Sequence, residues 1–270
     1  MWGMYVLSAH YWEQAVSEIS YYHDWHQLIL ITQGTVVLTV RGEEILGSEG
    51  DLLVLGRFEE HALRALSPDY KRYLLCISAD APHGGPEDRL LSSLITNRSA
   101  GFRRVIHMGE RRCEVEALFS SMVSECERRD VYGEEMADLL FRQLLIVLYR
   151  HEPALFEDRG EFTRLSDKVR RRLERDYGDR ITLSSLAEEF HVSPSHLSHL
   201  FRAVTGYSPI AYLVNVRLSE AKRLLEISDL SVKEIVFRCG FSDESNFSRT
   251  FRQRTGLTPV EYRRAVRSRR

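Results

Sequence analysis

The sequence predicts an α+β protein of two domains: an N-terminal β-barrel or sandwich with a helical hairpin, then an all-α domain with two helix-turn-helix motifs joined by a long helix. Apolar residues recur with period two from Leu28 to Ser78 and with helical period afterwards. Residues 1–160 hold 16 Lys and Arg against 25 Asp and Glu, whereas residues 161–270 hold 21 against 14. Within the basic part, a unit of about 50 residues occurs twice.

The composition indicates a globular protein, because 43% of its 270 residues are hydrophobic and 28% are charged. Met1–Ser20 lacks the basic start and apolar run of a signal peptide, and Leu139–Tyr149 is interrupted by polar residues. We therefore expect a cytoplasmic protein without a membrane segment. The four cysteines have no metal-ligand spacing, so we expect structural thiols in a reducing compartment. The net charges of −9 and +7 predict a polyanion-binding module beside an acidic domain; the alternative is a solvated charged face.

Residues 28–78 contain short β-rich runs separated by turn residues such as Gln33-Gly34 and Arg41-Gly42. Strands this short and this closely spaced are typical of a sandwich or a small barrel. The expected strands are 28–31, 35–41, 43–46, 51–55 and 73–78.

Helical periodicity follows in 87–95, 110–128 and 134–150, and the last two are expected to form an antiparallel hairpin. Apolar residues give the third helix a wide apolar face, which packs on the barrel or forms a homodimer seam; we favour the seam slightly. The leucines of this face are Leu139, Leu140, Leu144, Leu145 and Leu148. His151–Gly160 is the expected hinge, which gives a first domain at 1–155, a linker at 156–163 and a second domain at 164–270.

The second domain is predicted to be helical throughout, because hydroxyl residues precede proline at Ser193, Ser208 and Thr258, as at helix N-termini. Capping boxes begin at Ser231 and at Thr258. The expected helices are 164–177, 182–190, 194–205, 209–227, 232–239, 243–255 and 259–268.

The internal repeat has an offset of 50 residues, which becomes 49 upstream, so one residue is inserted near Asn246. Each copy reads as a helix-turn-helix, at about 182–205 and 232–255, in which the second helix projects outward. The connecting helix, 209–227, spans roughly 28 Å, close to the ~34 Å between successive major-groove faces. Because the two copies differ in sequence, we expect the DNA site that they read together to be directional and non-palindromic. The repeated pairs are Leu197 and Phe247, Phe201 and Phe251, Arg202 and Arg252, Pro209 and Pro259, and Tyr212 and Tyr262.

The stretches ITLSSLAEEFHVSPSHLSHLFRAVTGYSPIAYL (181–213) and GFSDESNFSRTFRQRTGLTPVEYR (240–263) resemble the DNA-binding domain of AraC/XylS-type transcriptional regulators. Two residues depart from that pattern: Val236 replaces a usual alanine, and His191 replaces a common glycine; either could shift a helix slightly. The resemblance implies that the acidic half is a cupin-like effector-binding and dimerisation domain, with RNA polymerase a partner if the protein is an activator. The direction of regulation stays open.

Solvent-facing positions early in each second helix are the expected base readers. Arg249 suits guanine and Asn246 suits adenine, whereas serines offer single undirected hydrogen bonds, so the second copy is expected to have the sharper base preference. For Asn246 the alternative is helix capping, and for Arg202 and Arg252 phosphate contact is the favoured interpretation. The predicted DNA-binding residues are Ser195, Ser198, His199, Arg202, Glu244, Ser245, Asn246, Arg249 and Arg252.

The acidic half offers candidate effector ligands near its start, and aromatic crowding there suits stacking on a sugar, although packing against the barrel exterior is an equal alternative. The candidates are Tyr22, His23, Trp25, His26 and His61. Metal cupins, which this half resembles loosely, carry a His-x-His pair; His23-x-x-His26 departs from it, so we expect no metal, cofactor or enzyme activity. The alternatives are a regulator controlled by a protein partner, and a metal-dependent enzyme fused to a DNA-binding module.

Overall fold

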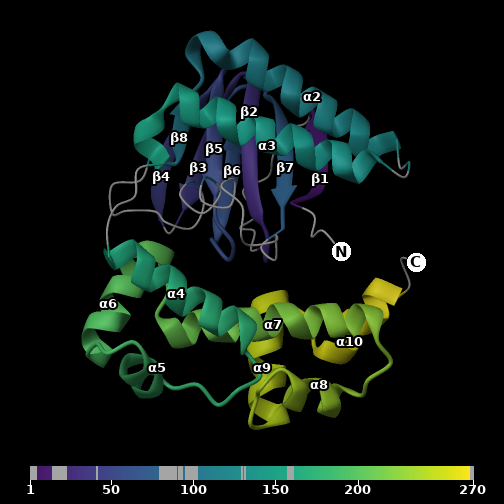
Figure 1. The fold of residues 1–270 in the computed structure, drawn as a ribbon. Helices are drawn as coiled ribbons and strands as arrows, with labels where there is room; N and C mark the ends of the chain where they lie inside the picture. The colour runs from purple at the N-terminus through teal and green to yellow at the C-terminus, as the bar shows by residue number, and fades with distance from the viewer. Residues whose placement is uncertain are drawn as a thin grey trace. The chain divides into compact units, whose positions relative to one another are not determined.

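The computed structural model describes residues 5–13, 23–40, 42–78, 90, 94, 103–128, 130, 132–156 and 161–267, with only the backbone at 161–164. The chain divides into two units, Met1–Arg159 and Gly160–Arg270. Figure 1 shows the first as β-strands covered by helices and the second as helices.

The first unit is built from two antiparallel sheets, one with the strand order β1-β7-β2-β5-β8 and the other with the order β4-β3-β6. Strands β3 and β4 pair as a hairpin in which Val40 is opposite Glu43, and Gly42 in the turn has the positive φ of 81° that such a turn requires. The strands are β1 (Val6–Trp12), β2 (His26–Gln33), β3 (Thr35–Val40), β4 (Glu43–Ser48), β5 (Asp51–Leu55), β6 (His61–Ala65), β7 (Lys71–Ile77) and β8 (Val105–His107).

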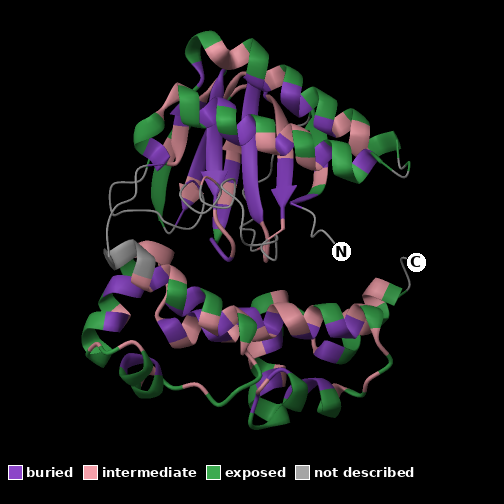
Figure 2. Ribbon diagram, in the orientation of Figure 1, coloured by how far each residue is buried: buried purple, intermediate pink, exposed green. Residues whose placement is uncertain are grey.

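The central strands β2 and β5 of the five-stranded sheet are buried on both faces, which explains why they are apolar at almost every position (Figure 2). Successive side chains of a strand point to opposite faces. Ile29 and Ile31 therefore join the apolar cluster between the two sheets, while Leu28 and Leu30 pack with the helices on the outer face. These two clusters form the core of the first unit.

The helical hairpin covers that outer face and consists of α2 (Arg112–Arg128) and α3 (Gly133–His151), preceded by the short helix η2 (Gly109–Arg111) and followed by η3 (Pro153–Phe156). Asp138 of α3 fixes it to the sheet, since its carboxylate accepts hydrogen bonds from the backbone N–H groups of Tyr5 and Val6. The predicted apolar face of α3 divides in two. The favoured seam is wrong for Leu144, Leu145 and Leu148, which lie in the core because this side of α3 packs on the sheet, whereas Leu139 is 60% exposed.

All five expected strands are present, but β1, β6 and β8 were not predicted. Each of the three carries polar or aromatic residues on an exposed face or is only three residues long, so its sequence lacks a clear period-two pattern. The predicted hairpin helices are confirmed. The helix expected at 87–95 falls outside the described residues, apart from positions 90 and 94.

The second unit contains seven described helices, and their bounds differ from the expected ones by no more than three residues. Helix α7 packs against helices from both halves of the repeat, and apolar side chains from α8 and α9 pack against its second half. No described helix of either unit has the length and apolarity needed to cross a membrane. The helices are α4 (Glu161–Arg175), α5 (Leu183–Glu189), α6 (Pro194–Thr205), α7 (Pro209–Ile227), α8 (Val232–Arg238), α9 (Glu244–Thr255) and α10 (Pro259–Arg267).

Candidate nucleic-acid interface

The first helix-turn-helix consists of α5 and α6. The Thr182 side chain and Ser185 form a capping box at the start of α5, and Ser193 caps α6 by accepting a hydrogen bond from the backbone N–H of His196 at 3.2 Å. Leu186 and Leu197 are buried between the two helices, which fixes their crossing. Both helices fall within the predicted range of about 182–205.

The second helix-turn-helix consists of α8 and α9 and repeats this construction. Ser231 and Glu234 form the predicted capping box of α8, and Asp243 caps α9 by accepting from the backbone N–H of Asn246 at 2.7 Å. The inserted residue lies in the turn, where Ser242 and Asp243 replace the single cap Ser193. The sequence repeat predicted the insertion near Asn246, and the structure has it a few residues earlier.

The two turns adopt the same backbone conformation despite their different sequences. Each has a residue with positive φ, His191 at 55° and Gly240 at 77°. Each closes with a hydrogen bond from the following residue, Val192 to the Ala187 carbonyl at 2.9 Å and Phe241 to the Val236 carbonyl at 3.0 Å. The departures at His191 and Val236 therefore leave the motif intact. The strain of a left-handed non-glycine residue falls on the exposed His191.

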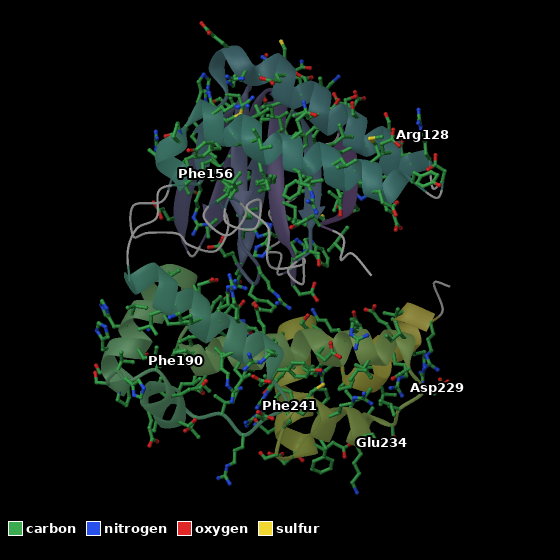
Figure 3. The ribbon with its side chains drawn as sticks, viewed as in Figure 1. Arg128, Phe156, Phe190, Asp229, Glu234 and Phe241 are labelled. Carbon is green, nitrogen blue, oxygen red and sulfur yellow. The ribbon has the colours of Figure 1, made fainter. Side chains whose placement is uncertain are left out.

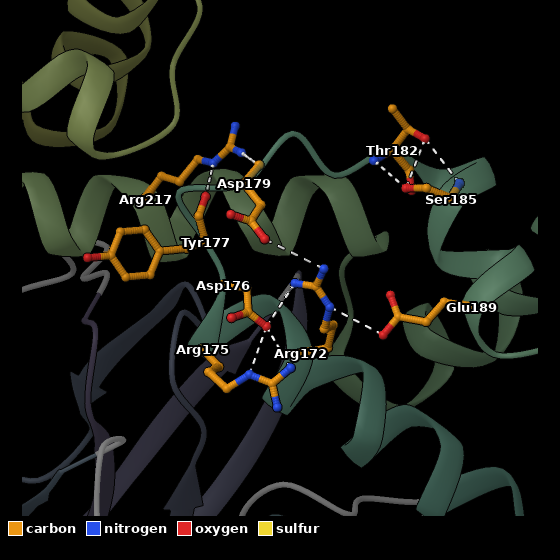
Figure 4. Close-up of polar contacts among 9 residues, drawn as sticks. All are labelled: Arg172, Arg175, Asp176, Tyr177, Asp179, Thr182, Ser185, Glu189 and Arg217. Carbon is orange, nitrogen blue, oxygen red and sulfur yellow. Dashed lines mark hydrogen bonds and ion pairs between the residues drawn. The ribbon is translucent and has the colours of Figure 1, made fainter.

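The second turn also packs on the loop that joins α4 to α5. Arg217 of α7 donates to the carbonyl oxygens of Tyr177 and Asp179 at 2.8 and 2.7 Å (Figure 4). A Cβ at Gly240 would lie 2.8 Å from the Gly178 carbonyl oxygen and 2.9 Å from that of Tyr177, so only glycine fits. This junction of α7, the loop and the second turn fixes the two motifs relative to each other.

The predicted base-reading residues lie on the solvent-facing sides of α6 and α9. In Figure 3, Phe190 and Phe241 mark the turns that precede these helices. The exposed members are Ser195, His199, Arg202, Glu244, Ser245, Asn246, Arg249 and Arg252, and Ser198 is half-buried.

Asn246 and Arg249 contact each other. The Arg249 Nη2 donates to the Asn246 Oδ1 at 3.2 Å. Because Asp243 supplies the cap of α9, the side chain of Asn246 is not engaged in capping and faces solvent beside Arg249. This hydrogen bond joins two candidate base readers, a feature that spacing alone did not indicate.

Four of the five candidate effector residues are described, and they lie at one end of the first unit, where β2 and β6 begin. His23 stacks on Trp25 with ring centroids 4.7 Å apart, and its ring lies 5.3 Å from that of His61. The buried His26 accepts a hydrogen bond at Nδ1 from the backbone N–H of Arg57 at 2.9 Å. Tyr22 lies outside the described residues.

His61 is buried, and its Nδ1 lies 2.8 Å from the carbonyl oxygen of Glu59. Burial lowers its pKa, which favours the neutral imidazole. The Glu59 carboxylate is bound by Arg104 through two hydrogen bonds of 2.8 Å, a pairing that the sequence did not indicate. Among the described residues, no group of three or more His, Cys, Asp or Glu side chains has an arrangement suited to a metal ion.

Comparison with known proteins agrees with this geometry. Residues 186–265 match the family model of a helix-turn-helix domain, and residues 2–145, more than half of the chain, match that of an AraC-like ligand binding domain. The chain belongs to the AraC/XylS-type transcriptional regulators.

This AraC-family regulator is similar to curated relatives over most of its length. It is 27% identical to the HTH-type transcriptional activator RhaS of Klebsiella pneumoniae and 25% identical to RhaS of Escherichia coli O139:H28. Each alignment covers 90% of this chain and 86% of the relative. Its fold resembles that of Vibrio cholerae ToxT crystallised with an unsaturated fatty acid, with a TM-score of 0.58, 14% identity, and coverage of 96% of this chain and 95% of ToxT.

Proposed function

We propose that this regulator reads a directional, non-palindromic DNA site by placing α6 and α9 in successive major grooves. The observation that carries the proposal is the rigid spacing of the two motifs. Helix α7 contains 19 residues, which corresponds to about 28 Å, and it packs against helices of both halves of the repeat. Because the exposed residues of α6 and α9 differ, the two half-sites differ as well.

Arg249 and Asn246 carry most of the base discrimination in this proposal, with Arg249 on guanine and Asn246 on adenine. Arg202 and Arg252 bind phosphates and set the register of each helix. The small side chains Ser195 and Ser198, with His199, contribute weaker readout from α6. Their exposed or half-exposed positions support these roles.

Selection of duplexes from a random library by the full chain tests the proposal. The expected result is an asymmetric consensus with two blocks about one helical turn apart and a steep loss of affinity with salt. Inverting one block should abolish the preference. A palindromic consensus, a single block or no enrichment over random competitor would overturn it.

We further propose that a small-molecule effector, a carbohydrate, binds the N-terminal domain and acts through the linker at 156–163. The stacked rings of His23 and Trp25 next to His61 support a sugar-binding surface. Thermal-shift screening of the full chain with sugars tests this part. The absence of any stabilising sugar would contradict it.

The regulator is proposed to form a homodimer through the hairpin of α2 and α3. Large apolar side chains line the outer face of α3 at spacings of three, four and seven residues, as in a helix-helix seam. They are Tyr132, Met136, Leu139, Ile146 and Tyr149, each 43–75% exposed. RNA polymerase is proposed as a further partner if this protein activates transcription. The regulator is proposed to act in the cytoplasm, because its proposed partner is DNA.

A further inference from the structure

The strand β7 directs an arginine at the interior of the N-terminal barrel. In an antiparallel pair, residues opposite each other point to the same face. Arg72 is opposite Ile31 of β2, and the neighbouring pair is Leu74 and Ile29. Ile29 and Ile31 belong to the apolar cluster between the two sheets, and Leu74 packs against it. Arg72 therefore faces the same interior.

The guanidinium of Arg72 has no counter-ion among the described residues. Its Nε and Nη1 are shielded from solvent and have no hydrogen-bond partner. The nearest carboxylates in sequence are engaged elsewhere: Asp69 accepts from the Gln33 side chain at 3.0 Å, and Glu13 pairs with Lys71 at 3.2 Å. Arg72 is half-buried, and shielding part of a cation that lacks a carboxylate partner is unfavourable, so an anion bound at this position would be stabilised.

Tyr70 presents a second hydrogen-bond donor next to this arginine. The Arg72 guanidinium carbon lies 5.4 Å from the Tyr70 ring centroid, and the phenol is 1% exposed within the apolar cluster. Its hydroxyl lies close enough to the Arg72 guanidinium for that cation to oppose the effect of burial on the Tyr70 pKa, but no hydrogen bond of good geometry joins the two groups. Burial raises the pKa of Tyr70 to about 12, so the group stays protonated and can donate a hydrogen bond at neutral pH.

The edge strand β1 adds aromatic surface on the same face. Trp12 is opposite Arg72, and His10 is opposite Leu74 in the pairing of β1 with β7. The two rings lie 6.2 Å apart, and Trp12 is 42% exposed. A planar or apolar ligand body can pack against these rings while its charged end reaches Arg72.

We propose that this domain has a second ligand site, for an organic carboxylate, whose carboxyl group binds Arg72 and Tyr70 and whose body lies against Trp12. The guanidinium suits this group because it forms charge-assisted hydrogen bonds with carboxylates. The site lies five residues along β2 from His26, or about 17 Å, so it is separate from the histidine cluster. The inference therefore goes beyond the proposed carbohydrate effector: it adds a separate site whose ligands are acids, sugar acids included.

Thermal unfolding of the full chain with paired probes tests the inference. The probes are benzoate with benzamide, D-galacturonate with D-galactose, and octanoate with octanol, at matched ionic strength. At least one acid is expected to raise the Tm of the ligand-binding domain by roughly 2–4 °C or more, while its neutral partner does not. If no acid exceeds its neutral partner, or if inorganic phosphate alone stabilises the protein, the inference is wrong.

Substitutions separate a ligand role from a structural one. Arg72→Met removes the unpaired charge, so the ligand-free protein should keep or raise its Tm and lose the response to the acid. Tyr70→Phe should weaken that response. Lys71→Met, on the opposite face of the same strand, is the matched control and should keep the full response. A lower Tm of ligand-free Arg72→Met, or an unchanged acid response, would show that Arg72 serves the fold alone.

DNA binding is measured in parallel with the selected duplex. If the wild type binds this duplex specifically but does not respond to acids, only this inference fails. If the wild type responds to an acid but lacks sequence preference, the DNA-reading proposal fails and the carboxylate site stands.

Discussion

The hydroxyl of Tyr212 lies 2.6 Å from Oε1 of Glu174, and the equivalent pair in the second repeat, Tyr262 and Glu226, has the same distance. Each tyrosine lies in the first turn of the helix that follows α6 or α9, and each glutamate lies on the helix before the motif. The ring of Tyr212 also packs edge-on against Phe201, with centroids 5.5 Å apart. One side-chain hydrogen bond thus joins the helix before each helix-turn-helix motif to the helix after it. The internal repeat therefore includes this hydrogen bond.

Removing either hydroxyl should destabilise the second unit by about 1–2 kcal/mol, because a hydrogen bond to a carboxylate is lost while the ring stays in place. Tyr212→Phe and Tyr262→Phe are compared with the wild type by calorimetric unfolding. Tyr149→Phe, which alters an exposed tyrosine of the first unit, is the control and should leave that transition unchanged. Equal stability of all four proteins would show that the hydrogen bonds are dispensable.

Opposite effects are expected from substitutions in the two turns. His191→Gly should stabilise the second unit by about 0.5–1 kcal/mol, since a left-handed conformation is unfavourable for histidine. Gly240→Ala should cost about 2 kcal/mol or more, because a Cβ there meets two backbone oxygens within 2.9 Å at a positive φ. Urea unfolding measures both. Destabilisation by His191→Gly would mean that the imidazole makes a compensating contact.

Arg249→Ala is expected to relax specificity at one base pair, with a loss of about 1–3 kcal/mol that is confined to the preferred base. Arg252→Ala is the comparison and should weaken binding to all single-base variants of the site equally. Fluorescence anisotropy with a set of such variants distinguishes the two patterns. A uniform loss for Arg249→Ala would mean that Arg249 contacts only phosphate.

Leu139→Glu should convert the proposed dimer to a monomer, because it places a charge in the exposed apolar stripe of α3 without entering the core. The Tm at low protein concentration should change little. Ser120→Glu on the exposed side of α2 is the control. Analytical ultracentrifugation measures the mass of the assembly. An unchanged mass for Leu139→Glu would show that α3 is not part of the dimer interface.

Stability of the first unit should fall as the pH drops below about 6.5. Burial places the pKa of His61 below the ordinary value of 6.5 in the folded state, so the unfolded chain binds the proton more readily. The loss begins at the unfolded pKa and levels off below the folded one. His61→Gln should flatten the dependence of Tm on pH, whereas the exposed His199→Gln should not. An identical profile in wild type and His61→Gln would assign the effect to another group.

The helices of the second unit could be predicted in detail because their signals are local. Serine and threonine before proline, and glutamate three residues after a cap, act within one helical turn, and the structure retains these caps at Ser193, Ser208 and Ser231. The strands were predicted only where apolar residues dominate. Exposed polar and aromatic residues of β1 interrupt the alternation, so its pairing with β7 became visible only in the folded sheet.

The sequence alone determined the two domains, the duplicated motif and the candidate base readers, since periodicity, capping and charge are properties of neighbouring residues. Only the tertiary structure decided which leucines of α3 enter the core, that Glu174 and Glu226 bind the repeated tyrosines, and that Arg72 faces the barrel interior beside Tyr70. These relationships join residues on different elements. Their energy depends on how sheets and helices pack, which no local pattern encodes.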